Sequence, residues 1–210
     1  MYKSKIKNFL NNKTSYKSIN FSGRTNSHIW QLGLFIKKKY EKPVVLMPST
    51  LCVSPAIIFT NLKIKIIYID VDIRTGLMKE NLIKKNIKNN NISVIFFANL
   101  FGNCSNNKIY NFLKNKNILI IQDLAQTFIS YDKKVNDKIL FGDVILLSFG
   151  YSKIFDLGSG SILLTNSNEI KKFLNHIKVT HKKLNLNQKA IYYKKYLNWY
   201  NSVFQKKKII

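Results

Sequence analysis

A series of short apolar runs, alternating with helix-length amphipathic stretches, constrains the fold more than any other feature of the chain. The runs are PVVLMP, KIIYIDVD, SVIFFANLFG, ILIIQDLAQ, VILLSFG and GSILLTN. Most of them are apolar throughout, which is typical of strands covered on both faces of a parallel sheet. Helix candidates lie between the first four runs, as the crossover connections of parallel strands require. The sequence therefore predicts an α/β fold, with helices on both sides of a mostly parallel sheet in three α/β/α layers.

The intervening stretches carry helix signals of their own. Apolar residues at helical spacing after Gly23 predict a helix that begins near Thr25. A second helix is expected in SPAIIFTNL, with Ser54 as its N-cap and Pro55 at its first position. Further helices are expected in MKENLIKKNI and NNKIYNFLKNK and over residues 168–176.

The charge of the chain limits the classes of partner. The formal net charge is +25, and 35 residues are Lys or Arg, of which only Arg24 and Arg74 are arginine. Lysine is scattered along the chain, together with many Asn and Ile residues, so a coding bias explains it better than selection for a polyanion. Nucleic-acid proteins usually use arginine for bidentate contacts. Nucleic-acid binding is therefore not the favoured function, although weak binding at low salt is expected.

The sequence also indicates a compartment. Cys52 and Cys104 are its two cysteines, too few for a disulfide scaffold in a chain of 210 residues. The basic start lacks an apolar signal-peptide core, and no apolar run approaches the ~18 residues of a membrane span. We expect a soluble cytoplasmic protein that does not bind membranes.

Three reactive side chains follow apolar runs that should be neighbouring strands. Asp123 lies just after one run, Ser148 ends the next, and Lys153 follows five residues later in a glycine-containing loop. Ligands of such sheets bind beyond the carboxyl ends of the strands. An acid, a hydroxyl and a lysine there suit pyridoxal phosphate (PLP): the lysine forms a Schiff base, the acid pairs with the pyridinium nitrogen, and the hydroxyl helps to hold the phosphate. Taken singly, they could be a helix cap, a strand end and a surface charge.

Other polar residues give weaker signals. Asp70 and Asp72 follow a strand candidate at a spacing that indicates turns more than a metal site. His28 falls in a predicted helix and is interpreted as a packing residue, whereas His176 and His181 show no ligand pattern. No metal site is predicted.

Several segments, in order and spacing, carry a resemblance to a known family. They are SGRTNSHIWQLGL, LMPSTLCVS, IIYIDVDIRTGLMKENL, FFANLFGNCSNNKIYNF, IIQDLAQTF and LLSFGYSK. Together they resemble the sugar aminotransferases of the DegT/DnrJ/EryC1/StrS family, a branch of the fold-type I PLP enzymes. The similarity covers about Ser22 to Lys178, and the last two segments resemble the family's I-E-D-A-A-Q and S-F-x-x-x-K motifs. Asn99 stands where histidine is common in the family.

The resemblance implies catalytic roles for Lys153 and Asp123 and a cofactor contact for Gln126. Lys153 would form the Schiff base with PLP and shuttle the proton between the substrate carbon and the cofactor. Asp123 would pair with the pyridinium nitrogen and keep it protonated, so that the ring acts as an electron sink. Gln126 would reach the phenolic oxygen of the cofactor.

Four further residues would bind the cofactor, again by resemblance. Ser148 would bind the phosphate through its hydroxyl. Arg24 and Thr25 would bind the same phosphate through backbone N–H groups at a helix N-terminus, where the helix dipole favours an anion. Cys52 would pack against a face of the ring. Without the family context, Arg24 could pair with a surface acid and Thr25 could cap its helix.

The domain organisation follows from the extent of the resemblance. We expect an N-terminal leader over residues 1–21, a PLP-binding large domain over residues 22–180, and a basic, aromatic C-terminal helix over residues 181–210. The small C-terminal domain of the family, marked by a G-Y-N-x-R/K signature, is not expected in this chain.

The predicted function is transfer of an amino group, with glutamate as the expected donor, to a keto group of a nucleotide-linked sugar. The expected assembly is a homodimer, with a separately encoded C-terminal half as a further partner. Two alternatives stay open at this point: an inactive, truncated relic that folds poorly or binds cofactor without turnover, and a basic nucleic-acid-binding protein.

Overall fold

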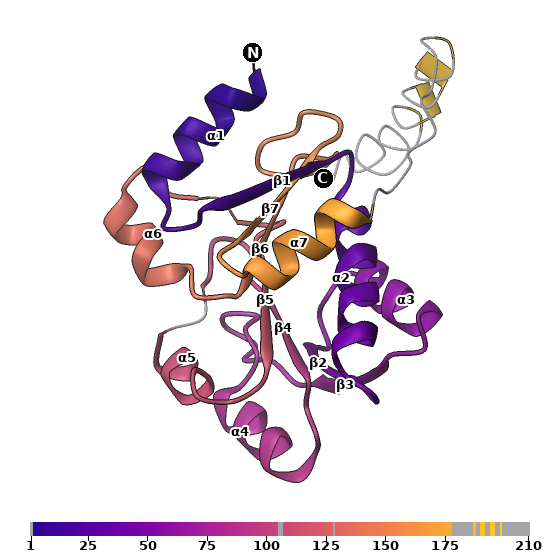
Figure 1. Ribbon diagram of the computed structural model, residues 1–210, viewed down its shortest axis with the longest axis vertical. Helices are drawn as coiled ribbons and strands as arrows, with labels where there is room; N and C mark the ends of the chain where they lie inside the picture. Colours follow the sequence, from indigo (N-terminus) through magenta and orange to yellow (C-terminus); the bar gives the residue numbers. More distant parts are fainter. Residues whose placement is uncertain are drawn as a thin grey trace, which may run out of the picture. The chain divides into compact units, whose positions relative to one another are not determined.

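A sheet of seven strands forms the centre of the molecule (Figure 1). The strands are β1 (Ser18–Ser22), β2 (Val44–Pro48), β3 (Lys65–Ile69), β4 (Val94–Ala98), β5 (Leu119–Asp123), β6 (Val144–Ser148) and β7 (Ser161–Thr165). Their order across the sheet is β1-β7-β6-β5-β4-β2-β3. Strands β2 to β6 are parallel, whereas β7 runs antiparallel to both of its neighbours, β6 and β1. The predicted mostly parallel sheet is confirmed.

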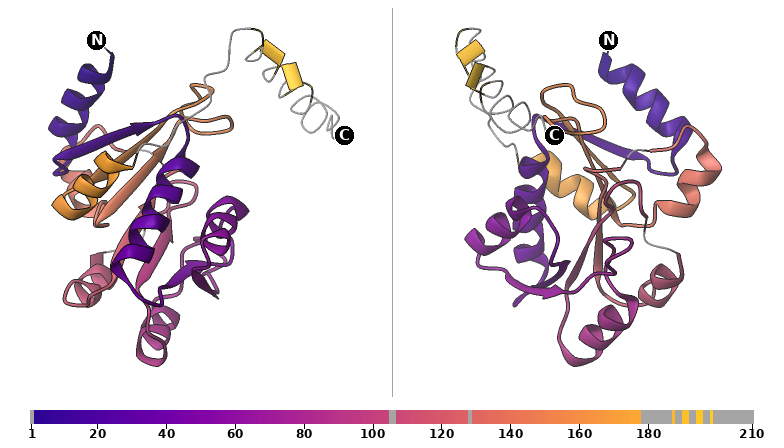
Figure 2. Two further views of the ribbon diagram at one scale, coloured as in Figure 1. Left: turned by 45° about the vertical axis from the view of Figure 1, so that its right-hand side comes forward. Right: turned by 180° about the vertical axis from the view of Figure 1, so that it is seen from behind.

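Helices cover both faces of this sheet, which gives the three layers (Figure 2). They are α1 (Tyr2–Lys13), α2 (Thr25–Lys39), α3 (Val53–Asn61), α4 (Glu80–Asn89), α5 (Asn107–Leu113), α6 (Lys133–Ile139) and α7 (Asn168–His176). Helices α2, α3 and α7 pack on one face. Helices α4 and α5, and further along α1 and α6, pack on the other. The predicted three-layer arrangement is therefore confirmed.

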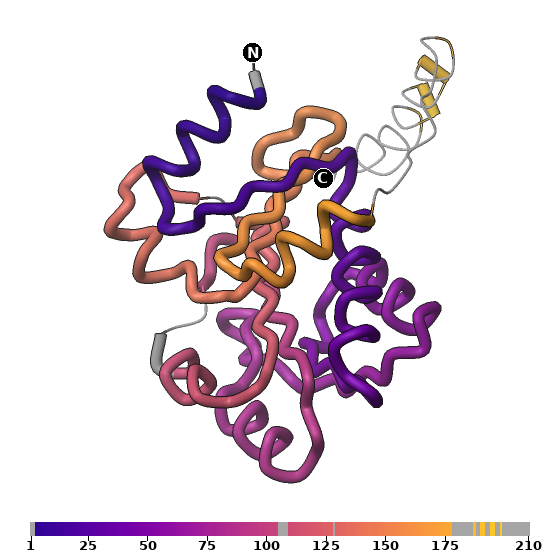
Figure 3. The backbone as a smooth tube through the Cα atoms, viewed as in Figure 1, coloured from indigo at the N-terminus to yellow at the C-terminus, as the bar shows by residue number. Residues whose placement is uncertain are grey.

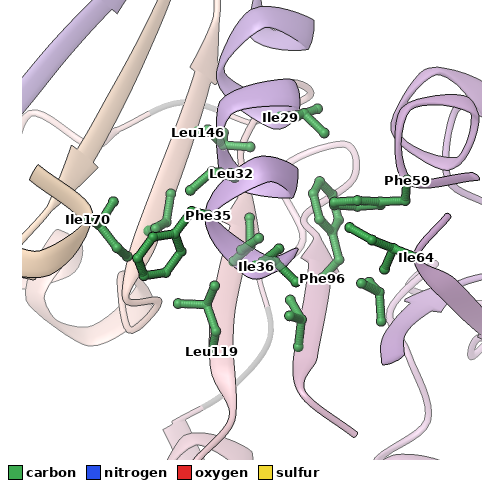
Figure 4. Packing of buried hydrophobic residues seen from close by; sticks show 14 of the residues in the cluster. Ile29, Leu32, Phe35, Ile36, Phe59, Ile64, Phe96, Leu119, Leu146 and Ile170 are labelled. Carbon is green, nitrogen blue, oxygen red and sulfur yellow. The ribbon is translucent and has the colours of Figure 1, made fainter. Parts of the chain in front are cut away.

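The two faces follow from the alternation of side chains along each strand. In β2, Val45 and Met47 point to the α2 side, whereas Leu46 points to the α4 side. On the α2 side, the core brings helix residues against strand residues (Figure 4). Phe59 of α3 meets Phe96 of β4 edge to face, with their ring centroids 6.1 Å apart. Such aromatic pairs hold α3, and with it one wall of the site described below, against the sheet.

The N-terminal residues, expected as a leader, form α1 and most of β1. The Tyr16 hydroxyl donates to the carbonyl of Gly142 over 2.6 Å. The buried Asn136 side chain donates to the carbonyls of Lys13 and Ser130 and ties α1 to α6. Neither α1, β1 nor α6 was expected from the sequence.

One predicted helix start was wrong by two residues. Helix α3 begins at Val53 with Cys52 as its N-cap, so Ser54 and Pro55 lie inside its first turn. No side chain caps this helix. The Ser–Pro pair had suggested the later start, but proline is tolerated throughout the first turn because the N–H it lacks has no intrahelical partner there.

The computed structural model describes residues 2–104, 107–127 and 129–177, and residues 187, 190, 191, 194, 195 and 198. The chain forms two compact units, Met1–Val179 and Thr180–Ile210. The described residues of the second unit are helical; His181 and most of the expected C-terminal helix lie outside the described residues. Within the described part, no helix combines the length and the apolar character needed to cross a membrane.

Candidate functional site

A pocket of about 220 Å³ lies at the carboxyl ends of β5 and β6. Its walls come from the start of α2, the start of α3, the end of β5 and the β6–β7 loop. The structure brings six of the seven residues predicted from the sequence to this pocket: Arg24, Thr25, Cys52, Asp123, Ser148 and Lys153. The seventh, Gln126, lies half-buried in the turn after β5 and does not line the pocket.

The β6–β7 loop carries the lysine. It lies beside the end of β1 and the start of α2 (Figure 3), and the Gly160 N–H donates to the carbonyl of Gly23 over 2.8 Å. Strand β6 ends at Ser148, so the hydroxyl and the lysine reach the pocket from the same connection. This contact between the loop and the residue before α2 explains how Lys153 and Thr25, far apart in sequence, line one pocket.

The start of α2 presents an unpaired hydroxyl. Arg24 is the N-cap in extended conformation, and its side chain makes no capping hydrogen bond. The Thr25 Oγ1 atom is buried and has no hydrogen-bond partner among the described residues. The first N–H groups of a helix also lack intrahelical acceptors. A buried, unpaired hydroxyl at the positive end of a 15-residue helix forms an environment suited to an anion.

Asp123 is the buried acid of the pocket, with 8% of its surface exposed. Burial raises the pKa of its carboxyl from the ordinary 3.8 to about 6, while the Ala125 N–H and the positive charge of Lys153 act in the opposite direction. That N–H donates to Asp123 Oδ1 over 2.8 Å. The backbone of the buried Asn99 fixes the same segment, because its N–H donates to the Asp123 carbonyl and its own carbonyl accepts the Thr127 hydroxyl.

The remaining wall comes from α3 and from residues that the sequence did not single out. Cys52, which is exposed at the N-cap of α3, lines the pocket together with Ser54. Tyr151, Asn26 and the polar backbone of the β6–β7 loop also line the pocket. Their closeness in sequence to Lys153 and Thr25 was the available signal. Which way a loop side chain points cannot be read from periodicity, so they were missed.

The other sequence candidates lie in structural settings. The side chains of Asp70 and Asp72 accept backbone N–H groups of Val71 and Arg74, and both form ion pairs, as expected for turn residues. His28 is buried, with Nδ1 3.0 Å from the Ser161 hydroxyl, in agreement with a packing role. The described residues contain no group of three or more His, Cys, Asp or Glu side chains that could hold a metal ion.

Comparison with known proteins identifies relatives of this chain. Residues 22–197 match the DegT/DnrJ/EryC1/StrS aminotransferase family. GDP-perosamine synthase of Escherichia coli O157:H7 is 26% identical over 170 residues, which cover 80% of this chain and 45% of that enzyme. The chain therefore spans less than half the length of this curated relative.

Solved structures share the fold at lower identity. The Helicobacter pylori aminotransferase PseC superposes with a TM-score of 0.70 at 14% identity, over 87% of this chain and 49% of that chain. The E. coli GDP-4-keto-6-deoxy-D-mannose-3-dehydratase with bound hydrated PLP gives a TM-score of 0.67 at 17% identity, over 82% of this chain and 44% of that chain. These neighbours confirm the fold of the PLP-dependent transferases that the sequence predicted.

Proposed function

Since the chain belongs to the DegT/DnrJ/EryC1/StrS aminotransferase family, we propose that it is a PLP-dependent aminotransferase. It would move an amino group from an amino acid, with glutamate as the donor, to a keto group of a nucleotide-linked sugar. The observation that carries this proposal is the pocket, where a lysine, a buried acid and an unpaired hydroxyl at a helix N-terminus meet. When bound, PLP supplies the electron sink that amino transfer requires.

The residues present fit the phosphate group of this cofactor. The unpaired Thr25 hydroxyl is buried at the start of α2, and Ser148 lines the same pocket. Leaving a buried hydroxyl unpaired costs about 1–3 kcal/mol, so an acceptor that enters the pocket recovers that energy. Thr25 and Ser148 would donate their hydroxyls, and the first N–H groups of α2 would complete the anion site.

Asp123 and Lys153 would do the proton chemistry. The buried Asp123 carboxylate would hold a proton at the ring nitrogen of the cofactor, because a cation is the partner that an isolated buried carboxylate needs. Lys153 would attach the cofactor through Nζ and carry the proton to and from the reacting carbon. Both side chains line the same pocket, which supports their action as one unit.

The size of the pocket bears on the substrates. At about 220 Å³ it is smaller than the ~300–1,000 Å³ typical of ligand sites. It suits a small cofactor, and a nucleotide-linked sugar would therefore bind mainly outside it. We propose that a second copy of the chain, or a separately encoded C-terminal half, completes that part of the site. We place the protein in the cytoplasm, where its two free cysteines would stay reduced.

The first experiment is to purify the chain with PLP and to record its visible absorbance before and after addition of glutamate. Lys153→Ala is the test variant, and Lys134→Ala, an exposed lysine of α6, is the matched control. We expect a visible band that requires Lys153 and not Lys134, and that bleaches with glutamate. A visible band that does not change when glutamate is added would refute glutamate as the amino donor for this chain alone. A folded protein without a lysine-dependent band would refute the proposed function, and salt-sensitive DNA binding retained by Lys153→Ala would then favour the nucleic-acid alternative.

A further inference from the structure

The loop between β6 and β7 is held by its own polar contacts. At its base, the Phe149 N–H donates to the Gly160 carbonyl over 2.9 Å, and the Leu157 N–H donates to the Phe149 carbonyl over 3.0 Å. These bonds continue the β6–β7 pairing past the end of the sheet. They close the loop. Within it, the Lys153 N–H donates to the Gly150 carbonyl over 3.3 Å and closes a turn with Ser152 as its third residue, and side-chain contacts set the rest of residues 150–156.

One carboxylate spans that remaining part. Asp156 Oδ2 accepts the N–H of Ser152 over 3.1 Å, and Asp156 Oδ1 accepts the N–H of Gly158 over 2.7 Å. The acid therefore clamps the residue before Lys153 to the residue that begins the return to β7. A carboxylate that accepts two backbone N–H groups is a strong local constraint, because hydrogen bonds to a charged acceptor are stronger than neutral ones.

The clamped backbone is strained at the position that matters for the lysine. Ser152 has φ of 65°, in the left-handed region that disfavours residues with a side chain. Such conformations persist only when the surroundings impose them, and they concentrate at functional sites. Ser152 directly precedes Lys153, so its φ determines the direction in which the lysine leaves the loop.

We propose that Asp156 is a positioning residue for Lys153, whose carboxylate imposes the left-handed turn at Ser152 and thereby directs the lysine into the pocket. The inference rests on the proposed function for the role of Lys153, but not for the clamp itself. Asp156 is exposed and does not line the pocket. It acts through the backbone and touches neither the acid nor the anion site.

The test uses Asp156→Ala, with Asp156→Asn as the milder variant because an amide can accept only one of the two N–H groups. Asp132→Ala is the matched control, since Asp132 is also an exposed acid that accepts a backbone N–H, from Lys134 over 2.8 Å at the start of α6. The decisive variant is the double change Asp156→Ala with Ser152→Gly. Glycine adopts positive φ without steric cost and should restore the turn without the clamp.

Two measurements separate this inference from the proposed function. In the cofactor-free protein, hydrogen exchange of the Ser152 and Gly158 amides should speed up in Asp156→Ala, while the amides of β6 and β7 stay protected. Also without cofactor, the rate of reductive methylation of Lys153, measured by mass spectrometry relative to that of Lys134, should differ between Asp156→Ala and the wild type. With PLP, the Lys153-dependent band should form about tenfold more slowly in Asp156→Ala, and Ser152→Gly should restore most of that rate.

Each outcome decides one of the two proposals. Unchanged hydrogen exchange of the Ser152 and Gly158 amides in Asp156→Ala would show that the carboxylate does not hold them, which overturns the inference. Faster exchange with wild-type methylation of Lys153 and wild-type band formation would show that the clamp does not position the lysine, which also overturns it. If the wild-type protein forms no band, the proposed function fails, and the exchange and methylation results still decide the role of Asp156. Failure of Ser152→Gly to restore what Asp156→Ala loses would likewise count against the inference.

Discussion

Replacing Asp123 by asparagine should stabilise the cofactor-free protein at neutral pH. Burial raises the pKa of this carboxyl from 3.8 to about 6 in the folded chain. The folded state therefore binds the proton more tightly than the unfolded state, so this residue makes the protein less stable as pH rises from about 4 to about 6. At about 1.36 kcal/mol per pKa unit, the loss amounts to roughly 3 kcal/mol. Asparagine carries no charge and can still accept the Ala125 N–H.

The assay is urea unfolding of both proteins without PLP at several pH values from 4 to 7. The variant should exceed the wild type by up to ~3 kcal/mol in unfolding free energy at pH 7, and the difference should shrink toward zero near pH 4. Subtracting the wild type removes the pH effects of the other charges. Asp132→Asn, at an exposed acid, should differ from the wild type by less than ~0.5 kcal/mol. The reasoning would be refuted if Asp123→Asn were less stable than the wild type at pH 7. It would also be refuted if the difference in unfolding free energy between the two proteins did not depend on pH.

Two further changes test the anion site and the close packing of the backbone just before β6. Thr25→Val should leave the unfolding free energy of the cofactor-free chain unchanged or raise it, because it removes a buried unpaired hydroxyl. The same change should weaken PLP binding about tenfold. Equal PLP affinity of the variant and the wild type in a titration would count against Thr25 as a phosphate ligand. Gly142→Ala should lower the unfolding free energy by about 1–3 kcal/mol in urea, because the added Cβ would lie 2.7 Å from the Val144 carbonyl oxygen and 3.2 Å from the Gln122 N, both backbone atoms. Wild-type stability of Gly142→Ala would mean that the backbone there yields at little cost.

The parts of the fold that sequence could predict are those where a single segment carries its own signal. The run that becomes β6 is buried at four of its five positions, so its apolar character alone marks it as an inner strand. Strand β1 has the mixed sequence SINFS and exists because it pairs with β7, far away in the chain. Helix α6 is a short polar segment whose start depends on the Asp132 cap. Such elements form because tertiary contacts stabilise them, and local sequence patterns do not reveal those contacts.

The residues of the candidate site likewise fall into those that a local sequence signal could place and those that it could not. Asp123 and Ser148 end neighbouring parallel strands, so strand assignment was enough to place them together. Gln126 lies three residues beyond its strand, in a turn, where neither strand nor helix periodicity fixes the direction of a side chain. Its predicted contact with the cofactor stays a prediction. Asp156 gave no signal in the sequence, because its role depends on two backbone N–H groups that only the folded loop brings within reach.

The position of the pocket in the chain predicts that binding of the cofactor and selection of the proposed substrate depend on different parts of the protein. Among the described residues, those that line the pocket lie between Gly23 and Gly160, within the unit Met1–Val179. The polar groups proposed to hold PLP come from that unit, and its core holds their strands and helices in place. We therefore expect substitutions at Thr25, Asp123 and Lys153 to impair attachment of the cofactor. If the proposed nucleotide-linked sugar is the substrate, it exceeds a pocket of about 220 Å³ and would be selected by surfaces beyond that pocket.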